Sequence, residues 1–324
     1  MKKLTAIFLT LCLMALSGAA LAADKQVVRI GIAQFANHPS LDNCRIGFLQ
    51  GLAEAGFVEG ENLTVDYQNA QTDMGLAAII SSAFVTSGMD LIAAIATPMA
   101  VTAVNTADGK IPVIYTAVSA PIEAGLAYAD QPFDGNATGT SDQIPVRDQL
   151  ALIRALQPQA KTIGLLYTVG EVNSQVQSAQ YREAAGEFGF TVVEATITTG
   201  ADIPLALPGL IAQADLLSML TDNTVVQHLD LVLDAADAAG LPVYGSEIEQ
   251  VKNGCVATVG IDYLALGHQT GLMAARVLKG EPADSIPFEV LKDFALYYNQ
   301  QALDRLGLVI PEELAGSMIE AGAQ

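Results

Sequence analysis

Polar residues follow seven of the strands that the sequence predicts, and they are the residues of this chain that could do chemistry. Three such groups lie in the first half of the chain and four in the second. Together they give these candidates for ligand contact: Gln34, His38, Thr97, Pro98, Ser119, Glu171, Asn173, Ser174, Asp222, Asn223, Thr224, Ser246, Glu247, Asp262 and Tyr263.

Two kinds of chemistry are open to these residues. Asn173, Ser174, Asp222 and Asn223 are types that cap helix N-termini by accepting backbone hydrogen bonds, and capping alone explains any one of them. Uncapped helix N-termini also bind carboxylates, because their N–H groups are free. A buried acid could then pair with a ligand's ammonium group. Helix ends and lone acids in this arrangement suit a small zwitterion.

Asp262 is the candidate that we expect to bind the ammonium group. It follows the apolar segment 256–261 and precedes Tyr263, so it should lie at a cleft. Thr97 and Ser119 would help to hold the ligand's carboxylate. If Asp262 instead caps the helix that follows it, the ammonium site moves to the acids Glu247, Glu171 or Asp222.

Motifs of enzymes and metal sites are missing from the sequence. The segment 31–34 lacks the glycine spacing of a dinucleotide-binding loop, and neither a Walker lysine motif nor a G-x-S-x-G elbow occurs. No nucleophile can be assigned to His38, and the three histidines are too widely spaced for a metal site. We therefore expect no enzymatic activity, no cofactor and no metal. Either core packing or ligand stacking could explain Phe35, Tyr115, Tyr167 and Tyr263.

Alternating strands and helices must position these residues. The apolar pattern of the first half predicts strands at 27–35, 62–67, 90–96 and 111–117, and helices at 41–56, 74–86 and 98–106. A Gly/Thr-rich, loosely structured stretch is expected at 135–140. The second half predicts strands at 161–167, 191–195, 216–220, 242–245 and 288–298, and helices at 146–156, 174–188, 224–239, 266–278 and 301–306. This alternation predicts two doubly wound, parallel-sheet α/β lobes with a ligand cleft between them.

The N-terminus has the layout of a secretory signal peptide. Lys2 and Lys3 precede an apolar run, and Ala20-Leu21-Ala22 is a small-x-small cleavage site. Cys12 lies behind Leu11 and not behind a small residue, so no lipid anchor is expected. We predict a signal peptide at 1–22 and a mature protein released into the periplasm.

Composition restricts the partners and the redox chemistry. The formal net charge is −20, and removal of Lys2 and Lys3 makes it −22, without any cluster of basic residues. Nucleic acid and anionic membranes are therefore poor partners. Cys44 and Cys255 are the cysteines that remain after processing, and we expect two buried free thiols.

The chain resembles a known family over nearly all of its mature length. The segments that carry the resemblance are VRIGIAQFANHPSLD, VDYQNAQTD, LIAAIATPMA, YTAVSAPIEAGL, LLYTVGEVNS, LTDNTV and VGIDYLALGHQTG. They are similar to exported substrate-binding proteins of ABC transporters, in the branch associated with tryptophan and tyrosine uptake. The resemblance implies a type I periplasmic-binding fold, with lobe 1 at 23–140 plus 264–287, lobe 2 at 141–263 plus 288–324, and three crossing segments. It supports as pocket residues Thr97, Ser119, Glu171, Asn173, Asp222, Asn223 and Asp262.

These observations lead to a main expectation and two competitors. The main one is an exported, monomeric solute-binding component of an ABC importer, which delivers a small amino acid or amino-acid-like solute to a permease and its ATPase. Aromatic amino acids are among the candidate solutes. A ligand-sensing module that signals to a membrane receptor would have the same export signal and fold. An exported enzyme would need a catalytic constellation that the sequence lacks.

Overall fold

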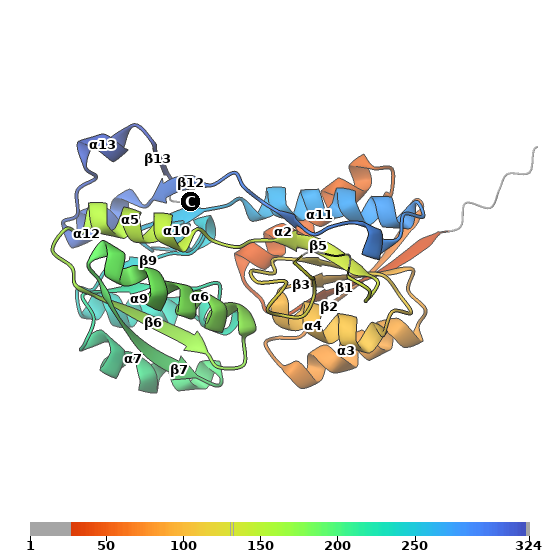
Figure 1. Cartoon of the computed structure of the whole chain (residues 1–324), viewed down its shortest axis with the longest axis horizontal. Helices are drawn as coiled ribbons and strands as arrows, with labels where there is room; N and C mark the ends of the chain where they lie inside the picture. Colours follow the sequence, from red (N-terminus) through yellow and green to blue (C-terminus); the bar gives the residue numbers. More distant parts are fainter. Residues whose placement is uncertain (1–26, 130, 132, 322–324) are drawn as a thin grey trace, which may run out of the picture.

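Two α/β lobes lie side by side in the computed structural model, which describes residues 27–129, 131 and 133–321 (Figure 1). The predicted signal peptide at 1–22 falls outside the described residues. No helix within the described ranges is long and apolar enough to cross a membrane.

A six-stranded sheet forms the first lobe, in the order β11-β5-β4-β3-β1-β2. Every neighbouring pair is parallel. The strands are β1 (Val28–Gln34), β2 (Leu63–Asn69), β3 (Leu91–Ile95), β4 (Val113–Thr116), β5 (Ala137–Ser141) and β11 (Glu289–Val290). Helices α2 (Pro39–Glu54) and α11 (Tyr263–Leu278) lie on one side of the sheet, and α3 (Met74–Thr86) and α4 (Thr97–Ala107) on the other (Figure 1). Central strands such as β3 are buried along their whole length, which explains their unbroken apolar sequence.

The second lobe has a parallel sheet in the order β7-β6-β8-β9 and a second group in the order β10-β12-β13. Backbone hydrogen bonds between β9 and β10 join the two groups. The strands are β6 (Thr162–Thr168), β7 (Thr191–Ile197), β8 (Leu216–Ser218), β9 (Val243–Tyr244), β10 (Ala257–Gly260), β12 (Ala295–Tyr298) and β13 (Met318–Glu320). Its α-helices are α5 (Val146–Leu156), α6 (Val172–Ala184), α7 (Ile203–Ile211), α8 (Asn223–Gln227), α9 (Leu229–Ala238), α10 (Ile248–Lys252), α12 (Gln300–Leu306) and α13 (Glu312–Ala315). The pair β10–β12 is antiparallel, a departure from the all-parallel expectation.

The chain crosses between the lobes three times. It leaves the first sheet after β5, returns from β10 into α11, and leaves again after β11 towards β12. One large apolar core fills the first lobe, and two separate cores lie on either side of the second sheet.

Four glycines let α2 and α11 pack almost backbone to backbone. A Cβ atom on Gly47 would lie 2.0 Å from the carbonyl oxygen of Leu264, and one on Gly267 would lie 2.0 Å from that of Cys44. Gly51 and Gly271 continue the same contact one turn further along each helix. We call this contact the glycine seam. It holds the start of α2 and the start of α11 in one rigid unit.

Several predicted elements differ from those in the structure. The stretch 135–140, expected to be loose, contains most of the fully buried strand β5. The single strand expected at 288–298 is two strands, β11 and β12, which belong to different lobes. The helix expected at 224–239 is divided at His228 into α8 and α9, and α7 was not predicted. Cys44 and Cys255 are both buried and unpaired within the described residues, as expected.

Candidate functional site

A small cavity lies where the two lobes meet. Both lobes and the crossing segments between them contribute to its lining, which consists of His38, Ser40, Leu41, Ala117, Asp142, Thr221, Asn223, Val226, Glu247, Gln250 and Tyr263. The volume open to the centre of a water molecule is about 20 Å³, so the cavity has room for a single water. A groove of about 270 Å³ shares five of these residues and leads from the cavity to the surface between α2, α9 and α10.

Two buried carboxyl groups face this cavity. Asp142, in the first crossing segment, accepts a hydrogen bond from the Tyr263 hydroxyl through Oδ2 at 2.5 Å. Its other oxygen, Oδ1, makes no hydrogen bond of normal geometry to a described residue, although the Ser119 hydroxyl lies near this carboxyl group. Glu247 accepts hydrogen bonds from the backbone N–H groups of Glu249 and Gln250 at the start of α10.

Burial makes ionisation of both groups costly. It raises the pKa of Asp142 above its usual value, and it raises the pKa of Glu247 from 4.5 to about 7. Neither Lys nor Arg occurs among the described residues that line the cavity. A cationic group in the cavity would supply a counter-charge to these two acids.

His38 and Ser40 bring further unsatisfied polar atoms to the same place. The ring of His38 lies near Asn223 and the hydroxyl of Ser40 near Glu247, but these buried atoms make no hydrogen bond of normal geometry to a described residue. Burial lowers the pKa of His38 from 6.5 to about 4, so the ring is neutral at pH 7 and offers one donor and one acceptor. Buried polar groups are normally paired, so such a cluster is typical of a ligand site.

Two helices of the first lobe begin without a side-chain cap. Within the described residues, α2 and α4 have no side-chain cap, and the hydroxyl of Thr97, the first residue of α4, is buried without a partner. Ala96 and Ala117 follow the neighbouring strands β3 and β4 with φ of 83° and 55°, which is strained for residues other than glycine. Since Ile95 pairs with Thr116, these turns lie next to each other at one edge of the sheet.

The N-termini of α8 and α10 in the second lobe are capped by the chain's own acids. Asp222 caps α8 through the N–H of Val225, and it also accepts hydrogen bonds from Thr168 and Ser174. Glu171 accepts hydrogen bonds from the backbone and side chains of Asn223 and Thr224. Burial, followed by the nearby Asp222, raises the pKa of Glu171 from 4.5 to about 7. These acids organise the lobe, and their oxygens are already in use.

Asp262 does not lie in the cavity. Its side chain is exposed, and its Oδ1 accepts hydrogen bonds from the N–H groups of Leu264 and Ala265 at the start of α11. The expectation that Asp262 receives a ligand's ammonium is therefore corrected: it is a helix cap. The apolar strand before it carried no information on which way the side chain turns.

Ser119, which was expected to hold the ligand's carboxylate, has a partner in the other lobe. Its hydroxyl lies 2.8 Å from the hydroxyl of Thr221 in the other lobe. Two more hydrogen bonds join the lobes, from Asn37 N to Gln227 Oε1 at 2.8 Å and from Asn43 Nδ2 to Glu249 Oε1 at 3.1 Å. These contacts hold the cleft closed.

The other candidates fall into three groups. His38, Asn223, Glu247 and Tyr263 line the cavity. Residues next to it with structural hydrogen bonds are Gln34, Glu171, Asn173, Ser174, Asp222, Thr224 and Ser246. Thr97 and Pro98 form the first turn of α4. The sequence reasoning missed Ser40, Asp142 and Gln250, and the signal for Asp142 was its place directly after a strand that was interpreted as a loop.

Comparison with known proteins agrees with this architecture. Residues 29–321 match the family model described as ABC transporter substrate binding protein. The chain is 38% identical to a tyrosine-binding protein of Clostridioides difficile (strain R20291), over 88% of this chain and 82% of the relative. A domain from Streptococcus pneumonia solved with L-Trp has a TM-score of 0.87 and 33% identity, covering 90% of this chain and 99% of that one.

The chain thus belongs to the ABC transporter substrate-binding protein family, with the type I periplasmic-binding fold. Its family is one of solute-binding proteins that serve ABC transporters outside the cytoplasm. A ligand-free, open structure of a Clostridium difficile substrate-binding protein is 39% identical, covers 91% of this chain and 99% of its own, and has a TM-score of only 0.67. The lobes are therefore arranged more as in the L-Trp complex than as in the open protein.

Proposed function

We propose that this protein binds an aromatic L-amino acid between its lobes and delivers it to the permease and ATPase of an ABC importer, without chemical turnover. The observation that carries the proposal is the buried Asp142 carboxyl group, which has one unused oxygen in a cavity whose described lining residues include neither Lys nor Arg. An α-ammonium group supplies the charge that this carboxylate needs.

The ligand's carboxylate would lie against the first lobe. The uncapped start of α4 and the unpartnered hydroxyl of Thr97 offer donors there, whereas the acids of the second lobe repel an anion. The buried side chains of His38 and Ser40 would supply further polar contacts to the ligand. Tyrosine and tryptophan are the first ligands to test, because one relative is a tyrosine-binding protein and another was solved in complex with L-Trp.

The cavity must open to admit such a ligand. A free volume of about 20 Å³ is far below that of an amino acid, so the lobes have to separate and close again around the solute. We propose that the moving bodies are lobe 1, at 23–140 plus 264–287, and lobe 2, at 141–263 plus 288–324. The three crossing segments near β5, β10 and β11 would then be the hinges.

Two measurements test the ligand class. Mass spectrometry of material released by denaturing the purified protein identifies a retained solute. Calorimetry on stripped protein, with tyrosine, tryptophan, phenylalanine and leucine, then ranks the affinities. A ligand at 100 times its dissociation constant should stabilise the protein by about 2.7 kcal/mol. If no amino acid binds, the proposed solute class is wrong.

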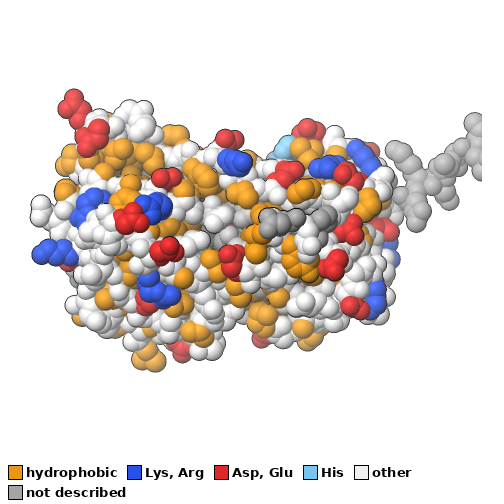
Figure 2. Space-filling view, viewed as in Figure 1, with side chains coloured by type: hydrophobic (Ala, Val, Ile, Leu, Met, Phe, Trp, Pro, Cys, Tyr) orange, Lys and Arg blue, Asp and Glu red, His pale blue; other side chains and the backbone are white. Residues whose placement is uncertain are grey.

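We also propose that the protein works in the periplasm as a monomer after cleavage behind Ala22. The motive is the Ala20-Leu21-Ala22 sequence together with the acidic mature chain, whose surface shows no basic cluster on the face in Figure 2. Intact-mass measurement of exported protein should find Ala23 at the N-terminus. A retained leader or an added lipid would contradict this.

A further inference from the structure

A chain of polar contacts crosses the cleft and ends next to Asp142. Its central link joins the hydroxyl groups of Ser119 in the first lobe and Thr221 in the second, at 2.8 Å. Thr221 and Asp142 both line the cleft cavity, whereas Ser119 is not among the lining residues. Ser119 therefore stands between a contact that closes the lobes and the acid that is proposed to bind the ligand.

The direction of the hydrogen bonds follows from Gln177 in α6. The backbone N–H of Thr221 donates to Gln177 Oε1 at 2.9 Å, and because an N–H group cannot accept, this contact identifies the oxygen end of the amide. The nitrogen end, Nε2, then donates to the Thr221 hydroxyl at 2.5 Å. Gln177 is buried, so water has little access to this amide.

The remaining protons can be placed from that end. Thr221 receives a proton from Gln177, and among the described residues the acceptor for its own hydroxyl proton is Ser119. Ser119 thus accepts from the second lobe and has its own proton left to donate. The Oδ1 atom of the nearby Asp142 makes no other hydrogen bond of normal geometry to a described residue and can accept this proton. In this direction every proton of the chain has an acceptor.

Two hydroxyl groups then favour the ionised form of Asp142. Burial raises the pKa of this carboxyl group, and the hydroxyls of Tyr263 and Ser119 counteract the rise. Tyr263 donates to Oδ2, and it stays protonated because burial raises its own pKa. A carboxylate that accepts from both hydroxyls has no proton to donate, and it binds a cationic donor more strongly than a neutral one.

We propose, on the basis of the function proposed above, that Ser119 is a positioning residue that makes the cleft prefer an α-ammonium to an α-hydroxyl group, by donating its proton to Asp142. Gln177 and Thr221 set the direction of this donation from the other lobe. Because the chain is complete only when the lobes meet, closure strengthens the preference for the ammonium group.

The test uses ligands that differ only in this group. L-Tyrosine is compared with L-3-(4-hydroxyphenyl)lactate, and L-tryptophan with L-indole-3-lactate, by calorimetry on stripped protein. The readout is the ratio of amino-acid affinity to hydroxy-acid affinity. Ser119→Ala should lower this ratio about tenfold, because a hydrogen bond to a charged group is lost when the ligand is the ammonium compound.

Thr221→Val is the matched variant, since it removes the same hydrogen bond between the lobes from the other side. The Ser119 hydroxyl remains and can still donate to Asp142. Both ligands should therefore bind more weakly, because closure is weakened for both, while the ratio should stay as in the wild type. Circular dichroism checks the fold of each variant.

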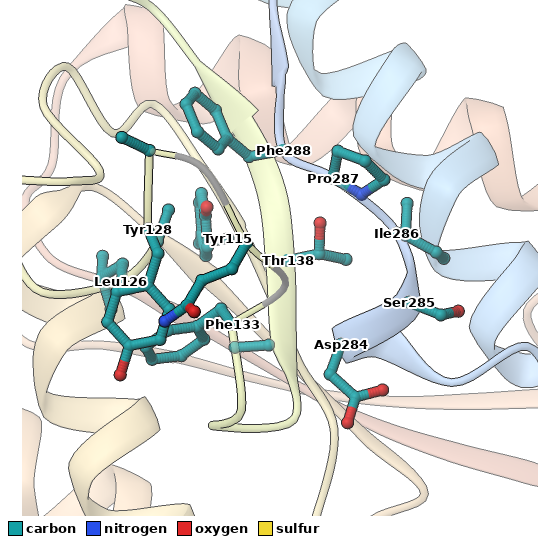
Figure 3. A pocket seen from close by; sticks show the side chains of 14 residues that line it. Tyr115, Leu126, Tyr128, Phe133, Thr138, Asp284, Ser285, Ile286, Pro287 and Phe288 are labelled. Atoms are coloured by element: carbon teal, nitrogen blue, oxygen red, sulfur yellow. The ribbon is translucent and has the colours of Figure 1, made fainter.

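Tyr115→Phe is the control for the loss of a buried hydroxyl on the same stretch of chain. Tyr115 lies beside a pocket of the first lobe that Thr138 and Phe288 also line (Figure 3), and its hydroxyl makes no hydrogen bond with a described residue. This pocket shares no lining residue with the cleft cavity. Both affinities should be unchanged in this variant.

Equal ratios in the wild type and Ser119→Ala would overturn the inference. An equal fall of the ratio in Ser119→Ala and Thr221→Val would also overturn it, because Ser119 would then act only by closing the lobes. In an Asp142→Asn background, Ser119→Ala should not change the ratio further, and a further fall would contradict an action through Asp142. Each of these results leaves the proposed function intact, whereas a wild type that binds neither tyrosine nor tryptophan would overturn both.

Discussion

At the scale of single residues, two aspartates at the lobe crossings have opposite surroundings. Asp142 is buried in the cleft cavity with an unused oxygen, whereas Asp262 is exposed and caps α11. Asp142→Asn removes the charge that is proposed to pair with the ligand's ammonium. We expect the binding free energy to weaken by about 2–5 kcal/mol, or roughly 30- to several-thousand-fold in affinity, as calorimetry would measure.

Asp262→Asn is the matched control, since it removes the same charge and asparagine still caps a helix. Its affinity should equal that of the wild type. Equal affinities of Asp142→Asn and the wild type would refute the assignment of the ammonium site.

Glu247 should give the ligand-free protein a characteristic dependence of stability on pH. Its folded-state pKa of about 7 lies above the unfolded value of 4.5 because of burial. The carboxyl therefore stabilises the fold fully below pH 4.5, and this contribution, about 3 kcal/mol at most, is lost as the pH rises through 7. Glu247→Gln removes it, so the variant should gain stability relative to wild type between pH 4.5 and 7.5.

Urea unfolding at several pH values measures this difference. His38 has the opposite effect, because its lowered pKa of about 4 removes stability on acidification below 6.5. Subtracting variant from wild type cancels that contribution. The exposed control Glu59→Gln should follow the wild-type curve. A difference between wild type and Glu247→Gln that stays constant with pH would mean that Glu247 does not titrate in this window.

At the scale of elements, the glycine seam between α2 and α11 is a contact of backbone against backbone. Gly267→Ala would force a methyl group to within 2.0 Å of the Cys44 carbonyl oxygen, so the helices would have to separate. We expect a loss of about 1–3 kcal/mol in the free energy of unfolding. Because His38 and Tyr263 stand at the starts of the two helices, ligand affinity should fall as well.

Gly209→Ala is the control at an exposed helix position with nothing within 4 Å of the new Cβ atom. It should stabilise the protein by about 0.5–1 kcal/mol, because alanine is the better helix former. Denaturant titrations of both variants measure these changes in the free energy of unfolding. A neutral Gly267→Ala variant would show that the helices can move apart freely.

Element positions were more predictable than site residues, for physical reasons. Buried parallel strands such as β3 are continuous apolar runs, and helices such as α5 have a clear apolar face, so both are visible in the sequence. Strand β5 has the sequence ATGTS and was not predicted, because its buried residues are small or polar and form no apolar run. Asp142 follows that strand, so the missed strand also hid the main candidate for the site. Nothing local could indicate that Asp262 turns outward.

At the scale of the whole molecule, closure depends on few direct contacts between the lobes. Gln227 accepts a hydrogen bond from the Asn37 backbone across the cleft, and neither residue lines the cavity. Gln227→Ala should therefore weaken the closed state and raise the ligand's dissociation rate about twofold to tenfold. Stopped-flow fluorescence measures the rate, and urea unfolding should show unchanged stability of the ligand-free protein.

Small-angle scattering gives the companion measurement. Ligand-free protein should have a larger radius of gyration than liganded protein, and Gln227→Ala should need more ligand to reach the compact form. Identical scattering with and without ligand would rule out closure as the response to binding.

The self-capped helix ends of the second lobe also bear on selectivity in a mixture of solutes. Inorganic phosphate and sulfate compete for open helix N-termini wherever they are abundant. At α8 and α10 the chain's own Asp222 and Glu247 occupy those positions as tethered competitors, at an effective concentration far above that of a free anion. The same carboxylates would repel the side chains of acidic amino acids. We therefore expect these two helix ends to disfavour inorganic anions before any solute has bound, because their N–H groups are already occupied by the chain's own carboxyl groups.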